Sequence, residues 1–442
     1  MTTLAATLAA LRSGQLKGIT RLDLACDLRE FPREIFELAD TLEVLNLSGN
    51  QLSALPDDLS HLSQLRVLFC SDNRFTQLPE VLSSCPRLEM VGFKSNGIRT
   101  VPAAAISPTL RWLILTDNQI SALPDSIGSC VRLQKLMLAG NQLAVLPEAM
   151  RGCVGLELMR ISANRFTALP EWLLQLPRLT WLAFGGNPVS TAPRGPSLAV
   201  ARLPWGDFKL GEKLGEGASG VIHKAHWQPS PHEAGQAVAV KLFKGAVTSD
   251  GFPADEMAAC LAAGNHAHLI GVIGELTGHP AGTSGLVMPW IDPEFRSLAG
   301  PPNLATCTRD IYRDDQRFPL PVLLGLAAGL ASAGAHLHAR GISHGDFYAH
   351  NVLYHPEGGC YLGDFGAASF YLPPAGGGAN PFEALEVRAF GCLLGELLER
   401  VDLELDARLP ALKALQLRCV APVVASRPRF AELVATLEAL RP

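Results

Sequence analysis

Hydrophobic residues in the first half of the chain recur with a period of 22 or 23 residues. One copy of the pattern LxxLxLxxNxL begins at Leu42, and the next begins at Leu65 as LxxLxCxxNxF. The asparagines of seven such copies stand at positions 50, 73, 96, 118, 141, 164 and 187. A weaker copy surrounds Leu22 and Leu24, with Asp27 in the asparagine position, so the pattern predicts eight units over residues 19–193.

Each unit predicts a short strand followed by a turn. Leucines two positions apart place both side chains on one face of a strand, and an asparagine amide can bond to backbone groups where the chain turns. No unit can bury its apolar face alone, so the units must stack on one another. These repeats resemble the leucine-rich repeat family, which implies an α/β solenoid.

The residues between the leucines are expected to point outward onto the concave surface of the solenoid. Many of them are large and apolar, and contiguous exposed apolar residues usually mark a protein interface. The alternative is that neighbouring strands cover one another. The residues expected to meet a protein partner are Phe69, Trp112, Met137 and Trp181.

The flanks of the repeats set the expected domain boundaries. Residues 1–18 lack the basic start of a signal peptide, so they predict a helix that caps the solenoid. Residues 194–204 contain proline and no periodicity, which predicts a linker. The remaining residues, 205–442, form the second predicted domain.

The second domain opens with glycines 215, 217 and 220 in GxGxxG spacing, followed by Val221. Their flanks alternate like the strands of a hairpin, which favours a flap over phosphates rather than a strand-to-helix turn. Lys241 then stands in the apolar strand AVAVKLF and requires an anion. Glu256, at the start of an apolar-periodic helix, is the candidate partner.

Two further motifs complete the set. Asp346 and Asn351 lie five residues apart in HGDFYAHN, and Asp364 begins a DFG triplet. In this order and spacing the motifs resemble the eukaryotic-type protein kinases over residues 205–442. The resemblance implies an α+β bilobal domain, with a small lobe over about 205–290 and a large lobe over about 291–442.

The resemblance also implies roles for the site residues. Lys241, held by Glu256, would pair with the phosphates of ATP, and Asn351 and Asp364 would hold Mg²⁺. Asp346 would orient and deprotonate the acceptor hydroxyl, so the implied catalytic residues are Asp346, Lys241 and Asn351. The implied nucleotide-binding residues are Gly215, Glu216, Gly217, Ala218, Gly220, Val221, Ala239, Lys241, Glu256, Met288 and Trp290.

Three departures from the family pattern concern regulation and substrate binding. Gly345 replaces the arginine that normally receives a phosphate on the activation segment, and Tyr348 replaces a lysine that stabilises the moving phosphoryl group. After the DFG triplet the chain reaches the next helix, expected near Glu386, within about twenty residues. Residues 380–383 (NPFE) would then be only a remnant of a substrate platform.

Charge and composition exclude some partners. A formal net charge of −5 provides no broad positive field for nucleic acid or an anionic membrane. Residues 318–335 carry no charge, but prolines and small residues favour a buried helix over a membrane span. Ten cysteines without a CxxC pair suit a reducing cytoplasm.

The sequence therefore predicts a cytoplasmic, Mg²⁺- and ATP-dependent protein kinase, more typical of serine/threonine than of tyrosine specificity, whose repeats bind a protein partner. Two alternatives remain open. The first is a pseudokinase scaffold that binds nucleotide without turnover, and its supporting features are Gly345, Tyr348 and the short segment after the DFG triplet. The HGD motif with asparagine five residues later also occurs in small-molecule phosphotransferases, although the DFG triplet and the glycine flap argue against that class.

Overall fold

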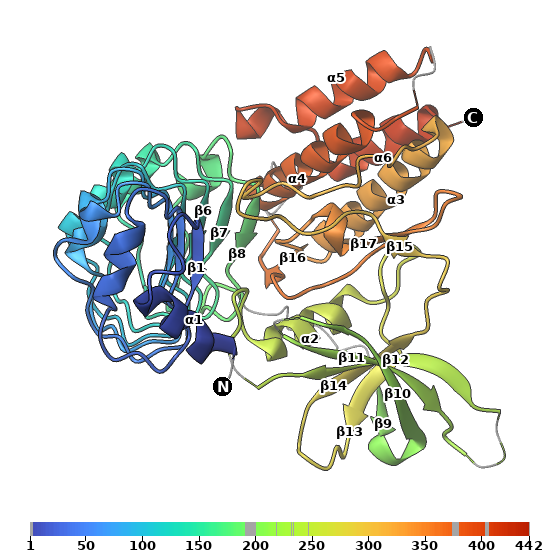
Figure 1. The fold of residues 1–442 in the computed structure, drawn as a ribbon. Coiled ribbons are helices and arrows are strands. Elements are labelled where there is room, and N and C mark those ends of the chain that lie inside the picture. Colours follow the sequence, from blue (N-terminus) through green and yellow to red (C-terminus); the bar gives the residue numbers. More distant parts are fainter. Residues whose placement is uncertain are drawn as a thin grey trace. The chain divides into compact units, whose positions relative to one another are not determined.

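The computed structural model describes residues 3–190, 200–217, 219–230, 232, 234–245, 247–373, 380–402 and 406–441. The chain forms two compact units, Met1–Leu179 and Thr180–Pro442 (Figure 1). The boundary therefore precedes the eighth repeat, whereas the sequence predicts a linker at 194–204. Residues 194–199 of that predicted linker lie outside the described residues.

The first unit contains helix α1 (Thr3–Arg12) and seven repeats, coloured blue to green in Figure 1. Each repeat contributes a three-residue strand: β1 (Arg21–Asp23), β2 (Val44–Asn46), β3 (Val67–Phe69), β4 (Met90–Gly92), β5 (Trp112–Ile114), β6 (Lys135–Met137) and β7 (Leu158–Arg160). Short 3-10 helices follow: η1 (Arg33–Leu38), η2 (Leu59–His61), η3 (Glu80–Ser84), η4 (Ala103–Ala105), η5 (Asp125–Ser129), η6 (Glu148–Gly152) and η7 (Leu173–Gln175). With β8 (Trp181–Ala183) of the eighth repeat, the strands form one parallel sheet in chain order, which confirms the predicted solenoid.

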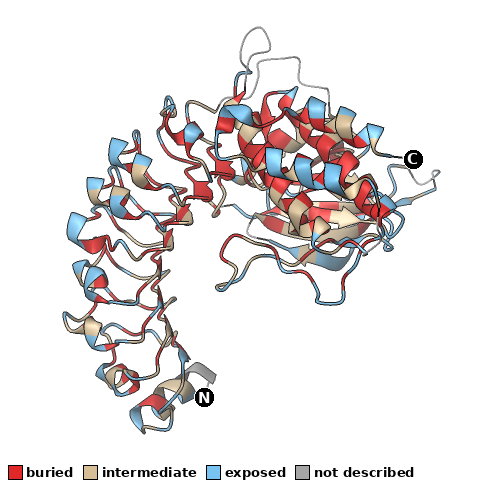
Figure 2. Cartoon of the chain, turned by 90° about the horizontal axis from the view of Figure 1, so that it is seen from above, coloured by how far each residue is buried: buried red, intermediate tan, exposed pale blue. Residues whose placement is uncertain are grey.

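The repeat asparagines bond to backbone groups as the sequence suggests. Asn50 accepts from the amides of Cys26 and Leu28 and donates to two carbonyl oxygens, those of Leu24 and Leu47. Each amide side chain therefore joins neighbouring turns, while the repeated leucines are fully buried. Figure 2 shows buried residues lining the interior of each repeat and exposed residues on its outer turns.

The second unit includes β8 and a small lobe. The elements of the small lobe are β9 (Ala201–Pro204), η8 (Trp205–Asp207), β10 (Phe208–Glu216), β11 (Gly220–Trp227), β12 (Gln236–Phe243), α2 (Pro253–Ala263), β13 (Gly274–Thr277) and β14 (Gly285–Pro289). Six strands form a sheet in the order β10-β11-β12-β14-β13-β9. The buried core of this lobe includes Val287 of β14 and two residues of β12, Val238 and Val240, which are two positions apart and so lie on the same face of the strand.

Strand β9 occupies the last four residues of the segment that the sequence predicts as a linker. Residues 201–204 pair in parallel with β13, and the Thr277 hydroxyl donates to the Leu203 carbonyl. Leu203 is buried in the core of the small lobe. The sequence could not show this because the prolines on either side resemble linker composition, whereas a proline at a strand end is compatible with an edge strand.

The large lobe carries the remaining elements. These are β15 (Arg296–Ser297), α3 (Leu320–His338), β16 (Ile342–Ser343), η9 (Ala349–Asn351), β17 (Val352–Tyr354), β18 (Cys360–Leu362), β19 (Ser369–Phe370), α4 (Pro381–Leu398), α5 (Leu409–Cys419), η11 (Val424–Ser426) and α6 (Phe430–Ala439). Helix α3 is long and apolar enough to cross a membrane, but 67% of its apolar window is buried in the protein, as in a core helix.

Helix α4 begins five residues before the position expected from the sequence, at Pro381. The Asn380 side chain accepts a hydrogen bond from the Phe382 amide, and Pro381 occupies the first helical position, where no amide donor is needed. Residues 381–383 are therefore the first turn of a helix rather than part of an extended platform. Glu383 bonds to the Phe430 amide and so joins α4 to the start of α6.

Candidate active site

Lys241 and Glu256 form a buried ion pair. Lys241 extends from β12, and Glu256 lies in the first turn of α2, so the pair joins the sheet of the small lobe to helix α2. Burial alone would lower the pKa of Lys241, but the carboxylates of Glu256 and Asp364 raise it overall. The ammonium group is therefore held charged and close to the DFG aspartate.

The glycine flap is a hairpin of β10 and β11. The Gly217 amide donates to the Gly220 carbonyl across its turn, and an added Cβ on Gly220 would lie 2.5 Å from the Leu242 carbonyl oxygen. Gly215 and Gly217 have open space around them, which leaves the backbone accessible to a phosphate. Ala218 lies outside the described residues.

Glu216 has a structural role in the flap. Its carboxylate binds Lys213 at 2.9 Å and also binds Lys244, which follows β12. These two lysines lower the pKa of Glu216 to about 2, with the hydrogen bond from Lys244 as the larger cause. The side chain thus fastens the flap to the sheet, which leaves only its backbone as a candidate for phosphate contact.

The predicted adenine-side residues lie on neighbouring strands. Ala239 of β12 pairs directly with Met288 of β14, and Val221 of β11 pairs with Leu242 of β12. Trp290 follows β14, and the Lys224 ammonium lies 4.5 Å from the centre of its ring. The sheet therefore brings these residues together across three adjacent strands.

Residues 344–351 form the candidate catalytic loop, and its own side chains order it. Asn351 donates through Nδ2 to the Asp346 carbonyl oxygen at 2.9 Å and to its carboxylate at 2.8 Å. This leaves the Asn351 amide oxygen available as a ligand. Asp364 is exposed, has φ of +56°, and accepts from the Gly366 amide at 3.2 Å. Oxygen atoms from Asn351 and Asp364 are the donors that Mg²⁺ prefers.

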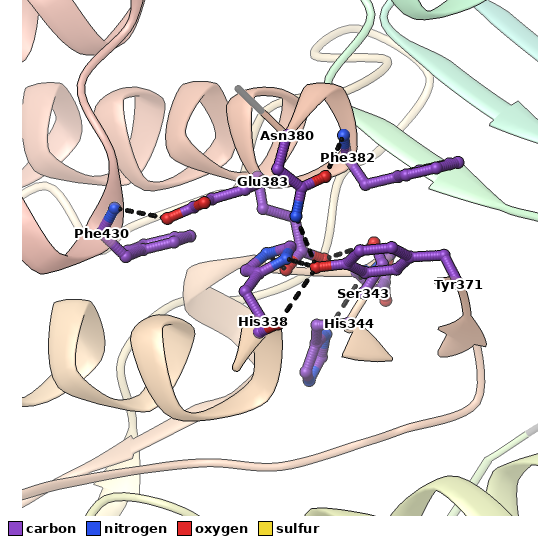
Figure 3. Close-up of polar contacts among 11 residues, drawn as sticks. His338, Ser343, His344, Tyr371, Asn380, Phe382, Glu383 and Phe430 are labelled. Carbon is purple, nitrogen blue, oxygen red and sulfur yellow. Dashed lines mark hydrogen bonds and ion pairs between the residues drawn. The ribbon is translucent and has the colours of Figure 1, made fainter. Parts of the chain in front are cut away.

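A buried carboxylate supports this loop from helix α4. Glu386 accepts hydrogen bonds from Ser343 Oγ, from the Gly345 amide and from His338 Nε2, at 3.0, 2.6 and 2.7 Å. Figure 3 shows the surrounding network, in which the Tyr371 hydroxyl lies between His338 and Asn380. The network connects α3, the catalytic loop, the segment after the DFG triplet and α4.

The structure explains the glycine at position 345. Gly345 has φ of +71°, and an added Cβ would collide with the Ala367 carbonyl and lie 2.9 Å from the carbonyl oxygen of Leu182. An arginine therefore cannot occupy this position without moving both segments. The two hydroxyl residues after the DFG glycine, Ser369 and Tyr371, are also buried.

Trp181 and Tyr348 form a contact that the sequence does not predict. Their rings stack with centroids 4.1 Å apart and an interplanar angle of 9°, and Trp181 Nε1 donates to the Phe347 carbonyl. Trp181 is only 2% exposed, so the expectation that it lies on an open partner-binding surface is wrong. The other three partner candidates, Phe69, Trp112 and Met137, are half-buried in the first unit.

His350 is held by Asp310, a residue that no motif in the sequence identifies. Its Nδ1 lies 2.7 Å from Asp310, which also accepts from the His350 amide. Burial would lower the pKa of His350, but the hydrogen bond and charge of Asp310 raise it overall. A histidine inclined to carry charge thus lies beside Asn351.

Comparisons with known proteins agree with this geometry. Residues 208–372 match the family model of protein tyrosine and serine/threonine kinases, and residues 40–84 match a model of leucine-rich repeats in two copies. A rice protein (Oryza sativa subsp. japonica) named cyclin-dependent kinase F-2 is 29% identical over 188 residues, which cover 41% of this chain and 54% of that relative. The chain thus spans about half the length of the curated relative that it matches. Both resemblances expected from the sequence are confirmed, and the chain combines leucine-rich repeats with a protein kinase domain.

Proposed function

We propose that the protein is an ATP-dependent protein kinase that transfers the γ-phosphate to a protein hydroxyl. The observation that carries this proposal is the convergence of Lys241, Glu256 and Asp364, whose charges act on one another inside the second unit. A buried lysine that is kept charged between two carboxylates is suited to a polyanionic ligand.

The residues of the chain divide the work of positioning and proton transfer. Lys241 and the flap backbone would hold the phosphates, and Asn351 and Asp364 would hold Mg²⁺. The metal ion, when bound, would neutralise charge on the phosphate oxygens. Asp346, oriented by two hydrogen bonds from Asn351, would accept the proton of the incoming hydroxyl.

A radioactive phosphate-transfer assay with the native protein and Asp346→Asn tests the proposal. This substitution keeps the shape of the side chain and removes the proton acceptor, so transfer should fall by roughly 10²- to 10⁴-fold. Lys241→Met should additionally weaken nucleotide binding. Native transfer no higher than that of Asp346→Asn would refute the kinase activity.

We propose serine or threonine, rather than tyrosine, as the acceptor. The segment Ala349-His350 lacks the arginine typical of tyrosine kinases after the catalytic aspartate. Phosphoamino acid analysis of a labelled protein substrate tests this. Phosphotyrosine as the main product would overturn the assignment.

A nucleotide-binding scaffold without turnover is the second candidate, because Tyr348 stands where a lysine is usual and is buried by Trp181. A scaffold of this kind would show a thermal shift with Mg²⁺ and ATP but no transfer and no ATP consumption. The two proposals therefore differ in a single turnover measurement on the native chain.

We propose further that the repeats of the first unit bind a protein partner in the cytoplasm. Phe69 and Trp112 meet edge to face with centroids 6.3 Å apart, and the Lys135 ammonium lies 4.2 Å from the centre of the Trp112 ring. The ten cysteines lie in the described part of the chain and form no disulfide bonds there, which suits a reducing compartment. A photo-crosslinking residue at position 69 should label a substrate protein more than one at the exposed Val145. Equal labelling at both positions would contradict this surface.

A further inference from the structure

The eighth repeat, residues 180–190, is packed into the kinase domain. Its first strand residue, Trp181, stacks on Tyr348 and donates to the Phe347 carbonyl, so it contacts the two residues directly after Asp346. The equivalent tryptophan of the fifth repeat, Trp112, is only half-buried and meets Phe69 of its own solenoid edge to face. The same repeat position thus has a different role in the eighth repeat.

The eighth repeat also holds the segment that follows the DFG triplet. The Phe184 amide donates to Ser369 Oγ at 2.9 Å, and the Phe370 amide donates to Ser190 Oγ at 3.0 Å. Residues 367–371 are all buried. Two hydrogen bonds, each between a backbone amide and a serine hydroxyl, therefore join the eighth repeat to this segment.

A third set of contacts reaches helix α2, which carries Glu256. An added Cβ on Gly186 would lie 2.8 Å from an Asp255 carboxylate oxygen and 2.9 Å from the Phe252 ring. Gly186 has φ of +69°, so only a residue without a side chain permits both this turn and this approach. The turn of the eighth repeat thus lies directly against the first turn of α2.

We propose that the eighth repeat is a fixed part of the catalytic machinery, with Trp181 as the positioning residue of the catalytic loop. The repeat contacts the catalytic loop, the segment after the DFG triplet and α2, which carry Asp346, Asp364 and Glu256. It holds them in the arrangement for transfer without a phosphate on the activation segment. The proposal rests on the proposed kinase function.

Position 345 supports this assignment independently of Trp181. An arginine that could grip a phosphate is sterically excluded by the Leu182 and Ala367 carbonyl groups, and Ser369 is occupied by the Phe184 amide. On the other side, Arg388 of α4 donates to Thr180 Oγ1 at 3.0 Å. The repeat is thus joined to the large lobe at both ends of β8.

The test compares three variants of the full chain: Trp181→Ala, Trp181→Phe and Trp172→Ala. Trp181→Phe keeps an aromatic ring for the stack but loses the hydrogen bond to Phe347. Trp172 is a tryptophan of the first unit with similar burial, at 5% exposed against 2%, so its truncation controls for general loss of packing. Hydrogen exchange of residues 345–351 and 367–371 is measured together with kcat and the KM for ATP.

Trp181→Ala should increase amide exchange in both segments roughly tenfold and lower kcat by roughly 10- to 100-fold, with the KM for ATP unchanged. Trp181→Phe should recover most of the loss, and Trp172→Ala should match the native protein in these segments and in kcat. Unchanged exchange or unchanged kcat in Trp181→Ala would overturn the proposal, as would equal effects of Trp172→Ala.

Failure of the proposed function has a different signature. If the native protein transfers no phosphate, the kinase proposal is refuted, and the exchange pattern alone decides whether Trp181 orders the loop. Native transfer together with native-like exchange in Trp181→Ala would leave the kinase proposal intact and remove the positioning role.

Discussion

Gly345 provides the sharpest test of how the second unit is packed. Substitution by alanine adds one methyl group at φ of +71°, where it meets the carbonyl groups of Ala367 and Leu182. A left-handed backbone costs an L-residue about 1–2 kcal/mol, and an overpacked methyl group costs about 1–3 kcal/mol more. Gly345→Ala should therefore destabilise the second unit by about 2–5 kcal/mol.

Gly278 is a matched control within the same unit. Its φ is +72°, and no atom lies within 4 Å of an added Cβ. Gly278→Ala should thus destabilise the second unit only by the free energy of the left-handed backbone, about 1–2 kcal/mol. The difference between the two variants isolates the steric contribution of the packed carbonyl groups.

Native-state hydrogen exchange of the amides in α4 measures this difference. Glu386 of α4 accepts from the Gly345 amide, so a displaced loop weakens the contact between the loop and this helix. Exchange reports the opening free energy of the second unit without requiring that the whole chain unfold in one step. Equal opening free energies for Gly345→Ala and Gly278→Ala would refute the close packing of the catalytic loop.

Substitutions at three further residues test the buried charges and the ring stack. Tyr348→Lys should lower kcat although lysine is the usual residue of the family at this position, because the ammonium group would be desolvated against Trp181. The kcat of Tyr348→Phe should stay near that of the native protein. A higher kcat in the lysine variant would contradict this prediction. Burial raises the pKa of Glu396 to about 7, so ionisation of this carboxyl group at higher pH destabilises the folded state. Glu396→Gln should therefore stabilise the protein by up to about 3 kcal/mol in urea unfolding at pH 8. This gain in stability should vanish below pH 4.5, where the carboxyl group is protonated in both the folded and the unfolded state. Burial would raise the pKa of Glu386, but His338 lowers it overall. The ionised carboxylate therefore stabilises the folded state above pH 4.5, and this stabilisation is lost as the pH falls further. The difference in unfolding free energy between the native protein and Glu386→Gln should narrow in acid, and a constant difference would refute this reasoning.

The parts of the fold that were predictable rest on local or periodic signals. The leucine and asparagine period specifies strands, turns and stacking, because each repeat presents the same face to the next. The site motifs also rest on local signals. A lysine on a buried strand requires an anionic partner, and Glu256 lies only fifteen residues after Lys241. Asn351 and Asp346 are close in sequence and are joined by hydrogen bonds in the structure.

The contacts that escaped prediction join residues far apart in sequence without a period. Trp181 and Tyr348 are 167 positions apart, and their ring types alone do not identify them as partners. Asp310 and His350 are likewise joined only by the tertiary fold. The start of α4 differs from the expectation for a local reason, because Asn380 and Pro381 cap a helix although their sequence resembles the remnant of a different motif.

The departures from the kinase pattern converge on one structural cause. Gly345 leaves room for the Leu182 carbonyl, Tyr348 provides a face for the Trp181 ring, and Ser369 accepts from the Phe184 amide. Taken one at a time in the sequence, the first two resemble losses in a degenerate kinase. Because all three residues contact the same four-residue stretch of the eighth repeat, a common origin accounts for them better than separate decay does. A segment held by hydrogen bonds to the eighth repeat needs neither an arginine that binds phosphate nor a long loop that packs around it, so a short segment after the DFG triplet is sufficient for this packing.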